Sequence, residues 1–272
     1  MREIRKVAQK ELSKRDPFWP VENEKLWIKT KEAKLVPLKL NKAQVYVLSI
    51  IKKLWEGNHP IRILLLKARQ LGMSTLIEAI IYSITSQIEN INADIIADEQ
   101  KRSDNLFEMS KLYQEKAPDH LKPEIKKSNA KKLEFDKIHS QILVETANDP
   151  DAGRSFTFQL VHLSEKARFK NPETLMLGLS QTVPALPHTI IIQETTANGF
   201  NHFKEEWDAA VNGETDYLPI FIPWYWAEEY KMDFVGDFVL GDTTLGSTTK
   251  DEPTLATIMH AEGITDVELR LS

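Results

Sequence analysis

Short apolar runs alternate with longer stretches of helical periodicity through most of this chain. Most of the short runs are nearly continuous in Val, Ile and Leu, a pattern typical of strands that are covered on both faces of a parallel sheet. These predicted strands are residues 61–66, 93–97, 141–145, 157–163, 189–193 and 218–222. Pro219 predicts an edge or strand-end position for the last of them, because proline cannot donate a hydrogen bond to a central ladder.

Between these runs, apolar residues recur every three or four positions, which predicts helices with one buried face. The predicted helices are residues 40–55, 75–89, 103–115, 175–183 and 202–211. Asn41 is the expected N-cap of the first helix, and Gly57 and Pro60 are expected to end it. Strands that alternate with helices predict an α/β fold with helices on both faces of a mostly parallel sheet. Residues 236–254 are rich in glycine and threonine and predict a loop.

Composition and charge narrow the range of functions. The 272 residues contain no cysteine, which excludes a disulfide framework, cysteine-ligated zinc, iron–sulfur clusters and thiol catalysis. A net charge of −5 excludes a uniformly basic nucleic-acid coat. No apolar run approaches the roughly 18 residues of a membrane span, and the charged N-terminus lacks the apolar region of a signal peptide. We therefore expect a soluble cytoplasmic protein with no membrane partner.

A deviant phosphate-binding loop joins the first predicted strand to the next helix. Its sequence is Lys67-Ala68-Arg69-Gln70-Leu71-Gly72-Met73-Ser74-Thr75. Against the Walker A pattern GxxxxGK[ST], Gly72 and Ser74 are in register, whereas Met73 takes the lysine position and Lys67 that of the first glycine. A helix N-terminus presents free N–H groups to phosphate, Ser74 can ligate Mg²⁺, and Lys67 or Arg69 can supply the missing cation. The alternative is a plain strand-to-helix turn with solvated charges.

Three further segments have the residue types that phosphoryl transfer requires. The strand at 157–163 leads into Ser164-Glu165, where a Walker B strand would end in Asp-Glu. Ser164 could bind a water on the metal, and Glu165 could orient the attacking water as general base. Arg154, in a polar turn, could stabilise phosphate charge in cis or in trans, and residues 195–199 (TTANG) could sense the γ-phosphate. The alternatives are a solvated glutamate, an exposed arginine and a simple Asn-Gly turn.

Taken together, these segments resemble the ATPase domain of the large terminase subunit, the DNA-packaging motor of tailed bacteriophages. The resemblance covers roughly residues 15–230 and includes residues 40–44 (LNKAQ), 67–75, 150–155 (PDAGRS), the strand ending at Glu165, 195–199 and 221–225 (FIPWY). It implies a P-loop (RecA-like) core at 41–230, an N-terminal segment at 1–40 packed on that core, and a linker or lid at 231–272. The linker would lead to an RNase H-like nuclease that this chain does not contain.

The resemblance also implies roles for individual residues. Those implied to bind ATP and Mg²⁺ are Gln44 (adenine), Lys67, Arg69, Gln70, Gly72, Met73, Ser74 and Thr75. Glu165 would be the catalytic glutamate, with Arg154 or Arg69 as the arginine finger. Thr195, Thr196, Asn198 and Gly199 would form the coupling motif. Ser164 would reach Mg²⁺ through water, and its replacement of the usual aspartate puts a direct carboxylate contribution from that position in doubt.

The implied function is ATP hydrolysis with Mg²⁺ that drives double-stranded DNA into a procapsid. The implied partners are the portal protein, the small terminase subunit and further copies in a ring, although the isolated domain can be monomeric. The implied location is the cytoplasm of the infected bacterial host, at the portal vertex. A helicase core is a second hypothesis, but it would need a second RecA-like domain. A non-hydrolysing nucleotide-binding module is a third, and Met73 and Ser164 favour it.

One lysine-rich segment is a candidate for DNA contact. It contains Lys122, Lys126, Lys127, Lys131, Lys132 and Lys137. A cluster of this kind attracts phosphates, and a solvated lysine-rich excursion is the alternative.

Overall fold

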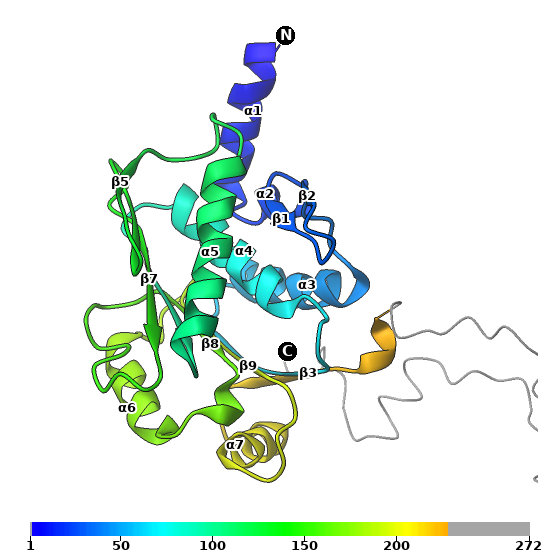
Figure 1. The fold of residues 1–272 in the computed structure, drawn as a ribbon, viewed down its shortest axis with the longest axis vertical. Coiled ribbons are helices and arrows are strands. Elements are labelled where there is room, and N and C mark those ends of the chain that lie inside the picture. The colour runs from blue at the N-terminus through cyan, green and yellow to red at the C-terminus, as the bar shows by residue number, and fades with distance from the viewer. Residues whose placement is uncertain (1, 228–272) are drawn as a thin grey trace, which may run out of the picture. The chain divides into compact units, whose positions relative to one another are not determined.

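The central element of the fold is a twisted eight-stranded sheet (Figure 1). The computed structural model describes residues 2–227, so the predicted loop at 236–254 and the predicted linker or lid at 231–272 lie outside the described residues. The strand order is β10-β3-β9-β8-β4-β7-β6-β5. The bounds are β3 Ile61–Lys67, β4 Asn92–Ala97, β5 Ile125–Ser128, β6 Lys132–Phe135, β7 Gln141–Thr146, β8 Leu160–Ser164, β9 Ile190–Thr195 and β10 Leu218–Ile222.

All six strands predicted from the sequence are present, and they run parallel to one another. The predicted edge position of the strand that contains Pro219 is confirmed, because β10 lies at one end of the sheet. Side chains of β3, β4, β8 and β9 are almost all buried, as expected for strands covered on both faces. The parallel arrangement brings the carboxyl ends of these strands to one edge of the sheet.

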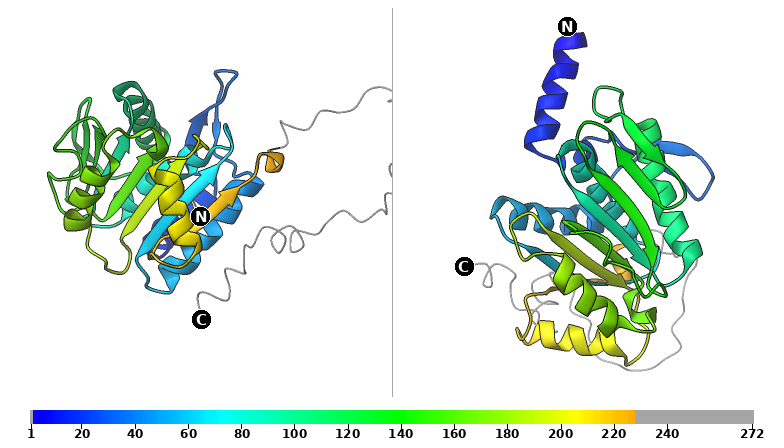
Figure 2. Two further views of the ribbon diagram at one scale, coloured as in Figure 1. Left: turned by 90° about the horizontal axis from the view of Figure 1, so that it is seen from below. Right: turned by 90° about the vertical axis from the view of Figure 1, so that its left-hand side faces the viewer.

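Helices cover both faces of the sheet (Figure 2). One face carries α3 (Lys42–Glu56), α4 (Met73–Gln87) and α5 (Gln100–Lys116), and the other carries α6 (Pro172–Thr182) and α7 (His202–Val211). The predicted N-cap is confirmed: Asn41 accepts a hydrogen bond from the Gln44 amide, and the Gln44 side chain accepts one from the Asn41 amide. The predicted α/β class with a mostly parallel sheet is therefore confirmed.

Each face of the sheet has an apolar core. Beneath α6, a cluster of buried side chains from β4, β8 and β9 includes Ile96, Val161 and Ile191. A smaller cluster beneath α7 joins Leu64 to Phe203 and Ala210. Burial at about 25 cal/mol per Å² makes such clusters the main stabilising contribution to the fold.

Two regions contain elements that the apolar pattern did not predict. The first is the N-terminal segment, with α1 (Arg2–Arg15), α2 (Trp19–Glu22) and a hairpin of β1 (Trp27–Lys29) with β2 (Leu35–Pro37). Helix α1 extends away from the sheet in Figures 1 and 2, and its last turn is anchored by a hydrogen bond from Ser13 to Gln87. The second region is the lysine-rich segment, which forms the antiparallel strands β5 and β6.

Two short 3₁₀ turns complete the described chain, η1 (Lys166–Arg168) after β8 and η2 (Trp224–Trp226) after β10. None of the helices within residues 2–227 has the length and apolar character needed to cross a membrane.

Candidate nucleotide site

The predicted phosphate loop connects the carboxyl end of β3 to the first residue of α4. Two of its residues have a left-handed backbone, Gly72 with φ +71° and Gln70 with φ +62°. Glutamine at a positive φ is a strained conformation of the kind that gathers at ligand-binding sites. A Cβ on Gly72 would lie 2.8 Å from the Gln44 Nε2 atom, so glycine also permits a close approach there. The loop is thus a tight turn that directs the N-terminus of α4 toward the sheet edge.

The N-terminus of α3 holds this loop in place. Asn41 Nδ2 donates to the Leu71 carbonyl at 3.1 Å, and Gln44 Nε2 donates to the Gly72 carbonyl at 2.8 Å. Gln44 is buried, and both polar atoms of its side chain have partners. The adenine-binding role of Gln44 stays a prediction. To bind adenine, the Gln44 side-chain amide would have to give up or share one of these two hydrogen bonds.

Lys67, and not the residue at the usual lysine position, brings a cation to the site. Met73 is 1% exposed and packs into the core, so it can meet a phosphate through its backbone N–H alone. The Lys67 Nζ atom lies 3.6 Å from Glu165 Oε1 and 3.6 Å from Glu194 Oε2. Lys67 therefore has an acidic partner on each of two neighbouring strand ends.

Glu194, near the end of β9, is a site residue that the sequence did not reveal. It is 0% exposed, and its Oε1 atom accepts hydrogen bonds from Ser74 Oγ and, at 3.1 Å, from Ser164 Oγ. His162 Nε2 lies 3.2 Å from the same oxygen, and His162 Nδ1 is bonded to buried Glu78 at 2.7 Å. A continuous polar network therefore runs beneath the phosphate loop, through α4, β8 and β9.

Opposite charges in this network stabilise the ionised forms of Glu194 and His162. Burial alone would raise the pKa of Glu194, but the charges of Lys67 and His162 and the hydrogen bond from Ser74 outweigh burial and bring the pKa to about 2. Burial would lower the pKa of His162, but its ion pair with Glu194 and its hydrogen bond with Glu78 raise that pKa to about 9. Burial raises the pKa of Glu78. At neutral pH the network thus contains an imidazolium next to the Glu194 carboxylate.

The predicted catalytic glutamate and the predicted coupling motif are in direct contact. Glu165 follows β8 with φ +58°, a strained backbone for a glutamate, and its Oε2 atom accepts a 3.3 Å bond from Thr196 Oγ1. Asn198 Nδ2 donates to the Ala167 carbonyl in the turn that follows Glu165. Gly199 has φ +69° and leads into α7. Residues 195–199 therefore contact both Glu165 and the turn that follows it.

The two candidate arginine fingers occupy different places. Arg69 is exposed on the phosphate loop. Arg154 lies against α6, where its guanidinium donates to the Thr174 carbonyl at 3.3 Å and its side chain covers Gly178. The choice between them stays a prediction, as do the roles given to Gly72, Thr75 and Thr195.

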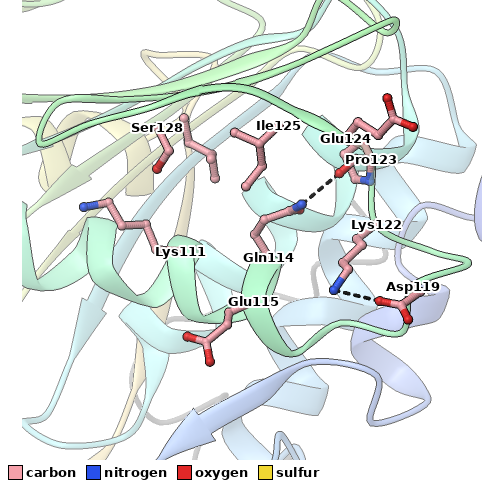
Figure 3. A pocket seen from close by; sticks show the side chains of 10 residues that line it. Lys111, Gln114, Glu115, Asp119, Lys122, Pro123, Glu124, Ile125 and Ser128 are labelled. Atoms are coloured by element: carbon pink, nitrogen blue, oxygen red, sulfur yellow. Dashed lines mark hydrogen bonds and ion pairs between the residues drawn. The ribbon is translucent and has the colours of Figure 1, made fainter.

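The lysine-rich segment differs from the expected basic patch. Lys126 and Lys132 both pair with Glu134, Lys137 pairs with Glu124, and Lys122 pairs with Asp119. A cavity of about 720 Å³ opens between this segment and α5, far along the sheet from β3 (Figures 1 and 3). Its lining mixes both charge signs, and dashed lines in Figure 3 mark the Lys122–Asp119 pair and the bond from Gln114 to Pro123. It does not coincide with the candidate nucleotide site.

A magnesium site fits the residues at the phosphate loop. No group of three or more His, Asp or Glu side chains within residues 2–227 is arranged as a self-sufficient metal centre. Mg²⁺ ordinarily needs no such cage, because it binds through one or two protein oxygens together with phosphates and water. The Ser74 hydroxyl and the Glu194 carboxylate are oxygens of this kind, and Glu194 Oε2 has no hydrogen-bond partner within the described chain.

Comparison with known proteins supports the fold. No protein-family model matches the sequence. The HK97 bacteriophage large terminase superposes with a TM-score of 0.60 at 14% identity, over 76% of this chain and 43% of that one. The large terminase of a thermophilic bacteriophage, solved in complex with ADP, gives a TM-score of 0.51 at 12% identity, over 67% of this chain and 45% of that one.

The chain thus spans less than half of the length of either large terminase. The superposition over that span supports the α/β, RecA-like fold that the resemblance implies. In its fold, the described part of this chain resembles the large terminases of tailed bacteriophages.

Proposed function

We propose that this chain is the ATPase part of a viral DNA-packaging motor, which hydrolyses ATP with Mg²⁺ and moves double-stranded DNA into a procapsid. The observation that carries the proposal is the convergence of Lys67, Ser74 and Glu165 at one edge of a parallel sheet. A hydroxyl for the metal, a cation for the phosphates and a carboxylate for the attacking water are the parts that phosphoryl transfer requires.

In this proposal catalysis is mainly positioning and charge stabilisation. The N–H groups at the start of α4 and the Lys67 ammonium would bind the β- and γ-phosphates, and the Ser74 hydroxyl would hold the Mg²⁺. Bound Mg²⁺ would supply neutralisation of the charge on the phosphates. Glu165 accepts a proton from the water that attacks the γ-phosphorus. Loss of the γ-phosphate then alters the Thr196–Glu165 contact, which couples hydrolysis to movement.

An arginine from another copy completes the site in this scheme. Arg154 is exposed on a turn, and its contacts are with α6 and its own turn. An arginine so placed can stabilise charge on a neighbouring subunit in a ring. The proposed partners are double-stranded DNA, the portal protein and the small terminase subunit, and the proposed location is the portal vertex in the host cytoplasm.

The test is phosphate release from ATP and Mg²⁺ as a function of protein concentration, with wild type beside Arg154→Ala. A ring with an arginine in trans gives specific activity that rises with concentration and is lost in the variant. Activity that is independent of concentration and survives the substitution assigns the finger to Arg69 or another group in cis. ATP binding with no hydrolysis, also in the presence of portal and DNA, would contradict the proposal.

That last outcome is the signature of the second candidate function, a non-hydrolysing nucleotide-binding module. Two observations favour it: Met73 is buried at the lysine position, and Ser164 stands where an aspartate is usual. Glu165 distinguishes the two functions, because binding alone does not require a carboxylate beside Lys67.

A further inference from the structure

The proposed magnesium site lacks the carboxylate that P-loop enzymes usually provide. In these enzymes Mg²⁺ is bound by the hydroxyl of the phosphate loop and by an aspartate at the end of a neighbouring strand. Here that strand is β8, and its last residue is Ser164, whose hydroxyl has no charge to balance the cation. ATP and Mg²⁺ need a carboxylate from another element if the proposed site is to work.

The neighbouring strand places a carboxylate at this point. In the parallel register of β8 with β9, Ser164 lies opposite Glu194. The Glu194 Oε1 atom accepts hydrogen bonds from both hydroxyls that matter, Ser74 of the phosphate loop and Ser164 of the aspartate position. A glutamate on β9 therefore reaches the same point that an aspartate on β8 would occupy.

The second oxygen of Glu194 is available for a cation. Glu194 Oε2 is buried and accepts no hydrogen bond within residues 2–227, and Lys67 Nζ lies 3.6 Å away. A buried carboxylate oxygen without a donor is costly, and native proteins rarely leave one without a ligand or a function.

We infer that Glu194 replaces the missing Walker B aspartate and is the protein carboxylate for the Mg²⁺ that accompanies ATP, with Ser74 as the hydroxyl ligand. This inference rests on the proposed function. The negative charge that position 164 of β8 usually provides would then come from Glu194 on β9. The Ser74–Glu194 hydrogen bond already brings the two proposed ligand oxygens to one point. Ser164 then acts as a positioning residue that orients the Glu194 carboxylate.

Binding measurements test the inference without relying on turnover. The affinity for ATP is measured by calorimetry with Mg²⁺ and with EDTA, and the ratio of the two dissociation constants defines the magnesium enhancement. Glu194→Gln should reduce that enhancement about 10- to 100-fold, the range found when groups that support a metal site are removed. Its affinity for ATP in EDTA should not fall.

Glu78→Gln is the matched control. Glu78 is also fully buried and is bonded to the other nitrogen of His162, but its carboxylate makes no hydrogen bond to the Ser74 hydroxyl. If Glu194 served only to partner His162, both substitutions would lower the melting temperature and neither would change the magnesium enhancement. Loss of the enhancement in Glu194→Gln alone supports the inference, whereas retention of the enhancement in a folded Glu194→Gln overturns it.

A second substitution that restores a carboxylate tests whether the two strand positions are interchangeable. The double variant Glu194→Gln with Ser164→Asp returns a carboxylate to the aspartate position, and we expect it to recover most of the magnesium enhancement. Lack of recovery in a folded double variant would contradict the exchange of positions between the two strands.

A spectroscopic measurement covers the case in which neither Glu194 variant folds. Glu165→Gln, labelled with ¹³C at its glutamate carboxyls, is loaded with ATP and with Mn²⁺ in place of Mg²⁺. Electron–nuclear double resonance should detect a ¹³C carboxyl close to Mn²⁺, which Glu194 supplies once Glu165 is gone. No such coupling would overturn the inference. A wild-type protein that binds no ATP would instead refute the proposed function.

Discussion

The edge of the sheet at the candidate nucleotide site, here called the nucleotide edge, and the β5–β6 hairpin are both rich in charged side chains. The two regions differ in how deeply these side chains are buried and in how they are paired. At the nucleotide edge, Lys67, His162 and Glu194 are buried and share partners in one network. In the hairpin, Lys126 and Lys132 pair with Glu134 near the surface. The first arrangement makes each buried charge depend on its neighbours, whereas the second is a pairing of two lysines with one glutamate near the surface, where water screens it.

Loss of one charged side chain should have different consequences for stability in these two regions. Removing one member of a buried network leaves its partner desolvated and unpaired, which is costly. Removing one member of an exposed pair leaves a hydrated ion. We therefore expect substitutions of the buried Lys67, His162 and Glu194 to lower stability as well as to change function, and substitutions in the hairpin to affect little.

The largest effect on stability should come from Lys67→Met. The substitution leaves the buried Glu194 carboxylate without its lysine, and the loss of a partner from a buried pair costs about 3–5 kcal/mol. Urea denaturation should show this loss, whereas Lys126→Met in the hairpin should leave the midpoint unchanged. A Lys67→Met protein as stable as wild type would mean that the network does not depend on this cation.

A smaller effect is expected from Gly72→Ala, with Gly213→Ala as its control. Both glycines have a left-handed backbone, which costs alanine about 1–2 kcal/mol, but only at Gly72 would the new Cβ meet Gln44. Displacement of Gln44 breaks the capping box of α3 and should add about 1 kcal/mol. Thermal denaturation of the two variants measures the difference. Equal losses would show that the Gln44–Gly72 contact adds nothing.

Thr196→Val should reduce turnover while leaving ATP affinity unchanged. The substitution removes a single hydrogen bond to Glu165, which is worth about 0.5–1.5 kcal/mol, or roughly a twofold to tenfold slower rate. Steady-state phosphate release at saturating ATP is the measurement. If turnover is unaffected, the contact between the coupling motif and Glu165 has no part in the chemical step.

The smallest effect should follow from the removal of hairpin lysines. Each lysine that contacts DNA phosphate adds about 0.9 to the slope of log affinity against log salt. Because Lys126 and Lys132 are already paired with Glu134, we expect that slope to be the same for wild type and for Lys126→Ala with Lys132→Ala. A slope that falls by one or more would identify the hairpin as a DNA contact.

The sequence predicts the sheet and its helices well because both arise from local patterns. Continuous apolar runs give the six parallel strands, and the Asn41 cap and the Gly72 turn follow from residue type and position. The β5 strand escapes prediction because Ile125–Ser128 is exposed throughout, so no apolar pattern marks it. In β6 only Leu133 and Phe135 are buried, and four residues are too few for their alternation to stand out. β6 pairs with β7 and β5 pairs with β6, so their place in the sheet comes from tertiary contacts.

The site is only partly predictable for a related reason. Lys67 and Glu165 follow from motif positions at strand ends and Ser74 from the start of the next helix, and their proximity follows from a parallel sheet. Glu194 stands beside the coupling motif in the sequence, but its role depends on which strand lies next to β8 and in which register. His162 and Glu78 are hidden inside apolar segments, so only the folded chain reveals that they meet.

The most direct test of the central claim is a single-turnover experiment on Glu165→Gln beside wild type, with ATP binding and phosphate release followed in the same samples. We predict that the variant binds ATP and Mg²⁺ as tightly as wild type and that its rate of phosphate release falls about 10²- to 10⁴-fold, the contribution typical of a general base. Phosphate release by Glu165→Gln at the wild-type rate would contradict the assignment of this sheet edge as the catalytic centre.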